Sequence, residues 1–288
     1  MLLDRMEEGM TILLKQVRLL GSKAILYGLL TFIAIFMILP FIWMLSTSFK
    51  PQAEIFVNPP TLISRNMSLD GYHYIIKFGV LRSLWNTFFV SFSFTFVALF
   101  FCALGGYGFA KYRFPGRNPL FAFLLGTMII PSAVLMVPTY IIMLKLGWLD
   151  TYWPLIIPGA ANAFGIFFMR QYISTISDEL LDAARIDGCS EFGIFLRCIL
   201  PICTPGLTTL GLIFFMNSWN NYLYPSIYLK SPEKFTLPLL MMQMQGPPGY
   251  SLYREWMGVA MVSVVPLLAL FLIFQRRFTE GITAGAIR

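Results

Sequence analysis

The residues whose types and spacing could do chemistry gather in one polar block, residues 179–205. It opens with Glu-Leu-Leu-Asp-Ala-Ala-Arg-Ile-Asp-Gly, from Glu179 to Gly188. The only histidine, His73, lies far from this block without a nucleophile or carboxylate pair, and the four cysteines lack paired C-x-x-C spacing. The block therefore lacks the pattern of a catalytic or metal site. Its charges would be costly in hydrocarbon, which predicts that it lies in water beside a membrane.

Two short helices joined by a glycine elbow are predicted for the block. Ser177 can cap the first helix, and Asp178 and Glu179 suit the positive end of its dipole. Gly188 ends this helix in the manner of a C-terminal cap. The residues expected to form its apolar stripe are Leu180, Leu181 and Ala184.

The second helix begins at Ser190, which can cap it, and presents Phe192 before Pro201 stops it. Ala183 and Ala184 are small, so another protein could approach the backbone of the first helix closely. From the residues alone, the block is either a docking surface or an interfacial helix that binds nothing.

The remainder of the chain has the composition of a polytopic membrane protein. Its 288 residues are 57% hydrophobic and only 12% charged, against about one quarter charged in soluble domains. The net charge of +7 comes from basic residues at the ends of apolar runs, which indicates topology and no nucleic-acid partner. Six runs approach the 20 or so residues needed to span a bilayer. We predict an all-α, six-span bundle as one domain, 1–288, with spans near 24–46, 84–110, 119–143, 152–170, 206–228 and 257–275.

Lysine and arginine positions predict the orientation of these spans. An N-terminus in the cytoplasm puts most basic residues there, together with the C-terminus and the polar loop 171–205. Segment 229–256 then lies outside. Prolines within the runs predict bends or hinges at Pro40, Pro131, Pro138, Pro158 and Pro266.

The polar block resembles the cytoplasmic EAA loop of permease subunits in binding-protein-dependent ABC importers of the carbohydrate-uptake group. The similarity rests on Asp182-Ala-Ala-Arg-Ile-Asp187-Gly188 with the downstream Leu200-Pro201, and Asp182 stands where the family motif has glutamate. Further similar stretches are Pro158-Gly159, Phe167 to Gln171, Ser218 to Pro225, Gln275 to Phe278 and Gly281 to Gly285.

This resemblance implies a type I importer permease in the bacterial inner membrane, and it implies partners. These are a second homologous permease, an ATPase dimer that binds ATP and Mg, and an extracytoplasmic solute-binding protein. The loop would act as the coupling helix that enters a cleft of the ATPase. The residues so implied are Glu179, Asp182, Ala183, Ala184, Asp187, Gly188 and Phe192. The outer loop would contact the binding protein through Gln243, Gln245 and Gly246.

The energy source is predicted from two absences in the sequence. No G-x-x-x-x-G-K-[ST] phosphate loop is present, so the chain is not the ATPase and is not expected to be an enzyme or to bind a cofactor itself. No predicted span holds an ionisable residue in its interior, which argues against proton- or sodium-driven transport.

The cargo is expected to be a sugar that meets aromatic and amide side chains in the fifth span. The residues chosen for this pathway are Asn217, Trp219, Asn220 and Tyr222. An aromatic belt with asparagines that join helices is the alternative interpretation. Alternative functions are an importer of another solute, such as glycerol phosphate or an acidic saccharide, an intramembrane lipid-modifying enzyme, and a membrane scaffold.

Overall fold

The computed structural model describes residues 2–64, 66–245 and 252–286, and every regular element in these ranges is helical. The predicted all-α fold is confirmed. In chain order the helices are α1 (Leu2–Ser48), α2 (Gln52–Ile55), α3 (Asp70–Lys77), α4 (Val80–Lys111), α5 (Arg117–Thr127), α6 (Met136–Lys145), α7 (Trp153–Ile156), α8 (Ala163–Ser174), α9 (Asp178–Ile186), α10 (Glu191–Ile194), α11 (Leu200–Ile202), α12 (Thr204–Trp219), α13 (Leu223–Tyr228), α14 (Leu237–Gln243) and α15 (Tyr253–Ala286). A π-helical turn covers Phe195–Ile199, and a 3-10 turn covers Pro232–Lys234.

The described chain forms two compact units. The smaller one comprises the chain up to Tyr72 together with Tyr253–Met261, and the larger runs from His73 to Leu252 and resumes at Val262. In the smaller unit the buried Lys50 lies with its ammonium 4.5 Å from the ring centroid of Trp43, and it donates to the carbonyl of Thr61. The ring face and the carbonyl together offset the desolvation of this charge.

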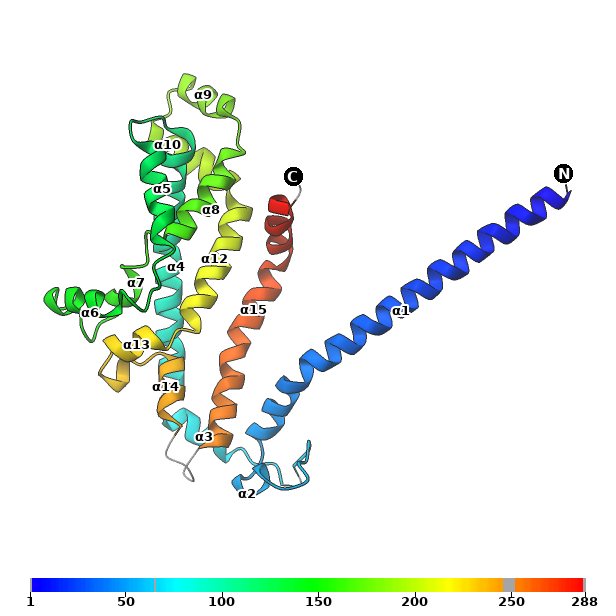
Figure 1. Ribbon diagram of the computed structural model, residues 1–288. Helices are drawn as coiled ribbons and strands as arrows, with labels where there is room; N and C mark the ends of the chain where they lie inside the picture. Colours follow the sequence, from blue (N-terminus) through cyan, green and yellow to red (C-terminus); the bar gives the residue numbers. More distant parts are fainter. Residues whose placement is uncertain (1, 65, 246–251, 287–288) are drawn as a thin grey trace. The chain divides into compact units, whose positions relative to one another are not determined.

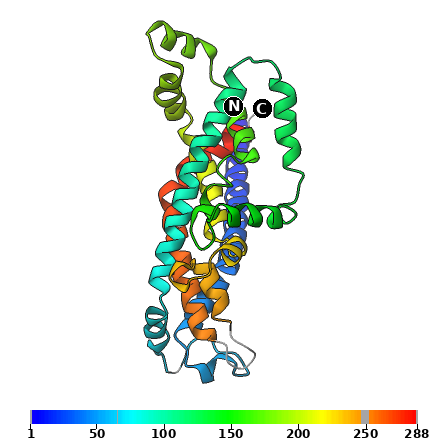
Figure 2. The ribbon, with the colours of Figure 1, turned by 90° about the vertical axis from the view of Figure 1, so that its left-hand side faces the viewer.

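The core of the larger unit forms where α4 packs against α8 and α12. Glycines let α4 and α8 approach closely. A methyl group on Gly106 would lie 2.7 Å from Cβ of Met169, and one on Gly165 would lie 2.5 Å from Sγ of Cys102. Figures 1 and 2 show α9 and α10 at the end of α4 where the chain turns into α5, and Figure 1 shows α13 and α14 toward the other end. Helix α4 therefore connects two separate regions of the larger unit.

Three of the six predicted spans are single long helices. Among the described residues, Leu20–Ser48, Val80–Lys111 and Tyr253–Gln275 are long and apolar enough to cross a membrane. The runs 119–143, 152–170 and 206–228 are each interrupted, giving α5 and α6, α7 and α8, and α12 and α13. The first two breaks contain Pro131 and Pro158, which were expected to bend their helices. The limits of these three spans stay a prediction.

Candidate functional sites: the polar block and a cavity

The polar block folds as two helices with the predicted caps. Ser177 Oγ accepts a hydrogen bond from the backbone N–H of Glu179 at the start of α9, and Ser190 Oγ accepts one from that of Gly193 in α10. Gly188 lies between the helices with φ +80°, a left-handed conformation that favours glycine. The predicted helix, glycine elbow and helix are therefore observed.

The second helix extends beyond the predicted stop at Pro201. Helical backbone continues through the π turn Phe195–Ile199 and α11, and the chain turns at Cys203 before α12. Proline has no N–H and its ring crowds the carbonyl four residues earlier. The wider π turn just before Pro201 gives that ring room, so helical backbone continues to Ile202, and the 79° bend into α12 lies at Cys203.

The face that α9 packs against the rest of the larger unit carries two of the three residues predicted for its apolar stripe. Leu181 and Ala184 are buried against the core of the larger unit, whereas Leu180 is exposed. The three-residue spacing of Leu181 and Ala184 puts both on this inner face, and contact of Ala184 with a partner stays a prediction. The outer surface carries Ala183, Ile186 and Phe192, and Ile186 is 86% exposed.

The remaining predicted docking residues lie on this outer surface. The side chains of Glu179, Asp182 and Asp187 are exposed, as is Gly188. We use the name coupling surface for the exposed residues Glu179, Asp182, Ala183, Ile186, Asp187, Gly188 and Phe192. Two large apolar side chains, Ile186 and Phe192, are thus exposed beside three carboxylates.

Polar contacts fasten α9 and α10, which carry the coupling surface, to the end of α4. Lys111 Nζ lies 2.6 Å from Oδ1 of Asp178, and the Tyr112 hydroxyl donates to Glu191. Arg185 joins the two short helices, since its Nε lies 2.8 Å from Oε1 of Glu191. The hydrogen bond from Arg185 lowers the pKa of Glu191, and the hydrogen bond from Lys111 lowers that of Asp178. Helices α9 and α10 are therefore joined to the end of α4 by charged contacts as well as by packing.

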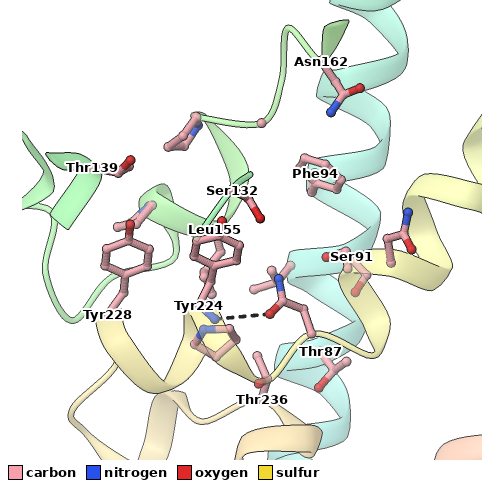
Figure 3. Close-up of a pocket in the computed structure, with 18 of the residues that line it drawn as sticks. Thr87, Ser91, Phe94, Ser132, Thr139, Leu155, Asn162, Tyr224, Tyr228 and Thr236 are labelled. Carbon is pink, nitrogen blue, oxygen red and sulfur yellow. Dashed lines mark hydrogen bonds between the residues drawn. The ribbon is translucent and has the colours of Figure 1, made fainter. Parts of the chain in front are cut away.

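A cavity of about 360 Å³ lies in the larger unit near the α13 and α14 end of α4. Its walls come from α4, the break before α6 with α6 itself, α7 with the break after it, the end of α12, α13 and the segment before α14 (Figure 3). The lining consists of apolar side chains, hydroxyls and amides, with no charged side chain among the lining residues. Such a cavity suits an uncharged, polar ligand.

Three buried hydroxyls in the cavity wall have no hydrogen-bond partner among the described residues. They belong to Ser91 of α4, Tyr228 of α13 and Thr236. Figure 3 shows Ser91 and Thr236 beside the α4 wall and Tyr228 across the cavity. An unpaired buried hydroxyl costs about 1–3 kcal/mol, so these groups are placed to bind a ligand or water.

Stacked tyrosines form part of the same wall. The rings of Tyr224 and Tyr228 lie 6.3 Å apart at 7°, and Tyr140 continues the stack 6.4 Å from Tyr228. Asn221 fixes the turn into α13 by accepting from the backbone N–H of Tyr224 (dashed line in Figure 3). The cavity thus combines aromatic faces with amides and hydroxyls.

The structure brings only one of the four predicted pathway residues, Asn217, to this cavity. Trp219 is buried elsewhere, where its indole N–H donates to Ser263 and its ring stacks on Phe215. Asn220 donates to the carbonyl of Met216, and Tyr222 is exposed. The hydroxyls of Ser91 and Thr236 were missed, because single hydroxyls within apolar sequence give no distinctive signal.

The predicted binding-protein contacts are partly described. Gln243 ends α14, and both Gln243 and Gln245 are exposed. Gly246 lies outside the described residues.

Comparison with known proteins shows the family. Residues 102–284 match the model of the binding-protein-dependent transport system inner membrane component. The arabinooligosaccharides transport system permease protein AraQ of Halalkalibacterium halodurans is 36% identical over 275 residues, covering 93% of this chain and 98% of that protein. The polygalacturonan/rhamnogalacturonan transport system permease protein YtcP of Bacillus subtilis is 31% identical, covering 92% and 97%.

The fold has a counterpart among solved structures. A chain of a bacterial ABC transporter involved in the import of the acidic polysaccharide alginate matches with a TM-score of 0.79 and 24% identity, covering 91% of this chain and 97% of the other. This chain therefore belongs to the family of binding-protein-dependent transport system inner membrane components. The prediction of an ABC importer permease, and not an enzyme, is confirmed.

Metal binding has no structural support in the ranges described. No group of three or more His, Cys, Asp or Glu side chains there could hold a metal ion.

Proposed function

We propose that this chain forms half of the translocation pathway of an ATP-driven importer of a neutral sugar. The observation that carries the proposal is that α4 and the residue after it contact α9 and α10, the helices that carry the coupling surface, while α4 lines an uncharged cavity toward its other end. Ser91 and Lys111 are 20 residues apart on this helix, which corresponds to about 30 Å. Motion imposed at the coupling surface can therefore reach the cavity through a single rigid element.

The proposed driving partner is a separate ATPase dimer, which binds ATP and Mg. The sequence has no phosphate loop, so hydrolysis requires another chain. The exposed Ile186 supplies an apolar anchor for a groove in that partner, and Asp182, Asp187 and Glu179 supply a charged rim. In this proposal the coupling surface and both chain termini are cytoplasmic, where the ATPase lies, and the chain is in the inner membrane.

The proposed cargo is a neutral saccharide. Tyrosine faces pack against the C–H faces of sugar rings, while amides and unpaired hydroxyls exchange hydrogen bonds with sugar hydroxyls. An acidic saccharide or glycerol phosphate would need a compensating charge, and the cavity lining offers none. A homologous second permease completes the pathway.

A solute-binding protein outside the membrane is the proposed donor of cargo. The family description names binding-protein dependence. We assign the contact to the segment that contains Gln243, Gln245 and Gly246.

Reconstitution tests this function directly. The chain is purified with its sister permease, ATPase and binding protein and placed in proteoliposomes, where uptake of arabino-oligosaccharides and of galacturonan fragments is measured with and without ATP. We expect ATP-dependent uptake of a neutral saccharide and no uptake by this chain alone. Uptake by this chain alone, driven by a proton gradient, would contradict the proposal.

A further inference from the structure

The carboxylate of Asp150 has all its acceptor positions engaged by one neighbouring segment. Asp150 lies between α6 and α7 and accepts from the backbone N–H groups of Lys230 and Ser231, each at 2.9 Å. It also accepts from the Ser231 hydroxyl at 2.6 Å and from Lys234 Nζ at 2.9 Å. A carboxylate offers about four acceptor sites, so this group is saturated by residues 230–234.

The backbone of Asp150 is also adapted to this contact. Its φ is +55°, the one positive value among the described non-glycine residues, and its N–H donates to the carbonyl of Tyr228 at 2.8 Å. Left-handed backbone is unfavourable for most residues and is best tolerated by Gly, Asn and Asp. Asp150 therefore adopts a costly conformation that aims both its main chain and its carboxylate at one segment.

The segment that Asp150 holds is a wall of the cavity. Residues 228–237, called here the wall segment, carry the unpaired hydroxyls of Tyr228 and Thr236. Its far end is fixed to α4, where Asn86 donates to the carbonyls of Glu233 and Phe235 at 2.9 and 3.0 Å. The N–H of Leu237 donates to Thr87 Oγ1 at 2.6 Å.

The wall segment thus has two anchors on different parts of the cavity. Asn86 and Thr87 belong to α4, while Asp150 immediately precedes α7, whose Pro154 and Leu155 line another wall. If α7 moves away from α4, the α4 anchor can stay intact, but the Asp150 anchor must break or draw the wall segment with it.

We infer that Asp150 is a positioning residue that holds the wall segment closed over the cavity and keeps Tyr228 and Thr236 in place for cargo. Only the identity of the cargo in this inference rests on the proposed function. The closure of the wall segment over the cavity is a property of this chain.

Thiol labelling measures the closure without any cargo. Ser91 is fully buried in the cavity wall, so a Ser91→Cys thiol should react slowly with a charged methanethiosulfonate reagent. The assembled transporter is placed in nanodiscs, which let the reagent reach both faces. Labelling of the same complex without Ser91→Cys gives the background from the four native cysteines.

Asp150→Gly removes the carboxylate while leaving a residue that tolerates positive φ. We expect it to raise the labelling rate of the Ser91→Cys thiol about tenfold or more, since it removes several charge-assisted hydrogen bonds. Asp150→Asn keeps an acceptor oxygen and a residue that tolerates left-handed backbone, so its labelling rate should lie closer to that of the parent than to that of Asp150→Gly. Lys234→Met removes the ion pair and the hydrogen bond from Lys234 to the Asp150 carbonyl but leaves the other three donors to the carboxylate, and it should raise the rate about threefold.

Two controls separate closure from general loosening. Asp70→Asn removes another carboxylate, which accepts from Ser68, and should leave the rate unchanged. A thiol at the buried position Ala98, outside the cavity lining, should remain unreactive in every variant.

The outcomes decide the inference independently of transport. Rates within twofold of the parent in both Asp150→Gly and Lys234→Met would overturn it, and so would a parallel rise at Ala98→Cys. If Asp150→Gly fails to assemble, the Lys234→Met result decides alone.

In uptake assays with the transported saccharide, Asp150→Asn should raise KM more than it lowers the maximal rate. Failure of uptake in the parent complex would contradict the proposed function and leave the labelling result intact.

Discussion

Replacing Gly106 with alanine should loosen the contact between α4 and α8. The added methyl would lie 2.7 Å from Cβ of Met169 and 2.8 Å from the backbone nitrogen of Arg170. Ordinary carbon contacts are about 3.5–4.0 Å, so the two helices would have to separate by about 1 Å. Backbone atoms cannot rotate away as a flexible side chain can, and overpacking of this kind costs about 1–3 kcal/mol.

The chain contains a matched control two residues away. Gly108 lies in the same helix, and a methyl there meets nothing within 4 Å. Both substitutions gain the same helix propensity, at most about 1 kcal/mol, so this term cancels when the two variants are compared. Gly106→Ala should therefore be about 1–3 kcal/mol less stable than Gly108→Ala.

The assay is thermal unfolding of the detergent-solubilised assembly, followed by the loss of the monodisperse peak in fluorescence-detected size exclusion. With about 2–4 °C per kcal/mol, the midpoint of Gly106→Ala should lie about 2–12 °C below that of Gly108→Ala. Equal midpoints would refute the close packing of α4 on α8.

Three further predictions follow from the topology, the cavity and the ionisable contacts. An impermeant thiol reagent added outside cells should label Lys230→Cys but label Arg113→Cys, in the exposed turn after α4, only after permeabilisation; the reverse pattern would overturn the orientation. Asn217→Ala should raise the uptake KM several-fold, as expected for about 0.5–1.5 kcal/mol of hydrogen bonding to cargo. Trp219→Phe should lower the stability of the protein by a similar amount and leave KM unchanged, because Trp219 bonds Ser263 away from the cavity. Equal effects of the two variants on KM would contradict the assignment of Asn217, and not Trp219, to the cavity. Because the pKa of Glu191 is lowered in the folded state, its contribution to stability is complete above the ordinary carboxyl pKa of about 4.3 and is lost as the pH falls through the lower folded value. The stability difference between the parent and Glu191→Gln should accordingly persist at pH 5 and vanish in stronger acid, and a difference already lost at pH 6 would argue against this contact.

Local sequence signals were sufficient to predict the structure of the polar block. Ser177, Gly188 and Ser190 act through their own backbone neighbourhood, so capping rules place the helix ends without knowledge of the tertiary fold. Which apolar residues of α9 face the bundle depends on tertiary packing, and for that reason Leu180 was placed in one stripe with Leu181 and Ala184 although it is exposed.

The cavity was only partly predictable from the sequence. Asn217 was found because a polar residue stands out in an apolar run, but the same reasoning selected Trp219, whose polar partner Ser263 is 44 residues away. The wall segment depends on contacts between Asp150 and residues about 80 positions later, and no local periodicity encodes such a contact. Pro131 and Pro158 predicted bends in two of the spans. They did not predict the lengths of the helices on either side of each break.

Coupling between ATP hydrolysis and uptake is the measurement that tests the central claim most directly. Ile186→Arg places a charge at the most exposed apolar position of the coupling surface, and Ile63→Arg makes the same change at an isoleucine that is 70% exposed outside that surface. In proteoliposomes containing the complete transporter, Ile186→Arg should abolish saccharide uptake and the stimulation of ATP hydrolysis by loaded binding protein, while Ile63→Arg retains both. Normal uptake by a stably assembled Ile186→Arg variant would contradict the account.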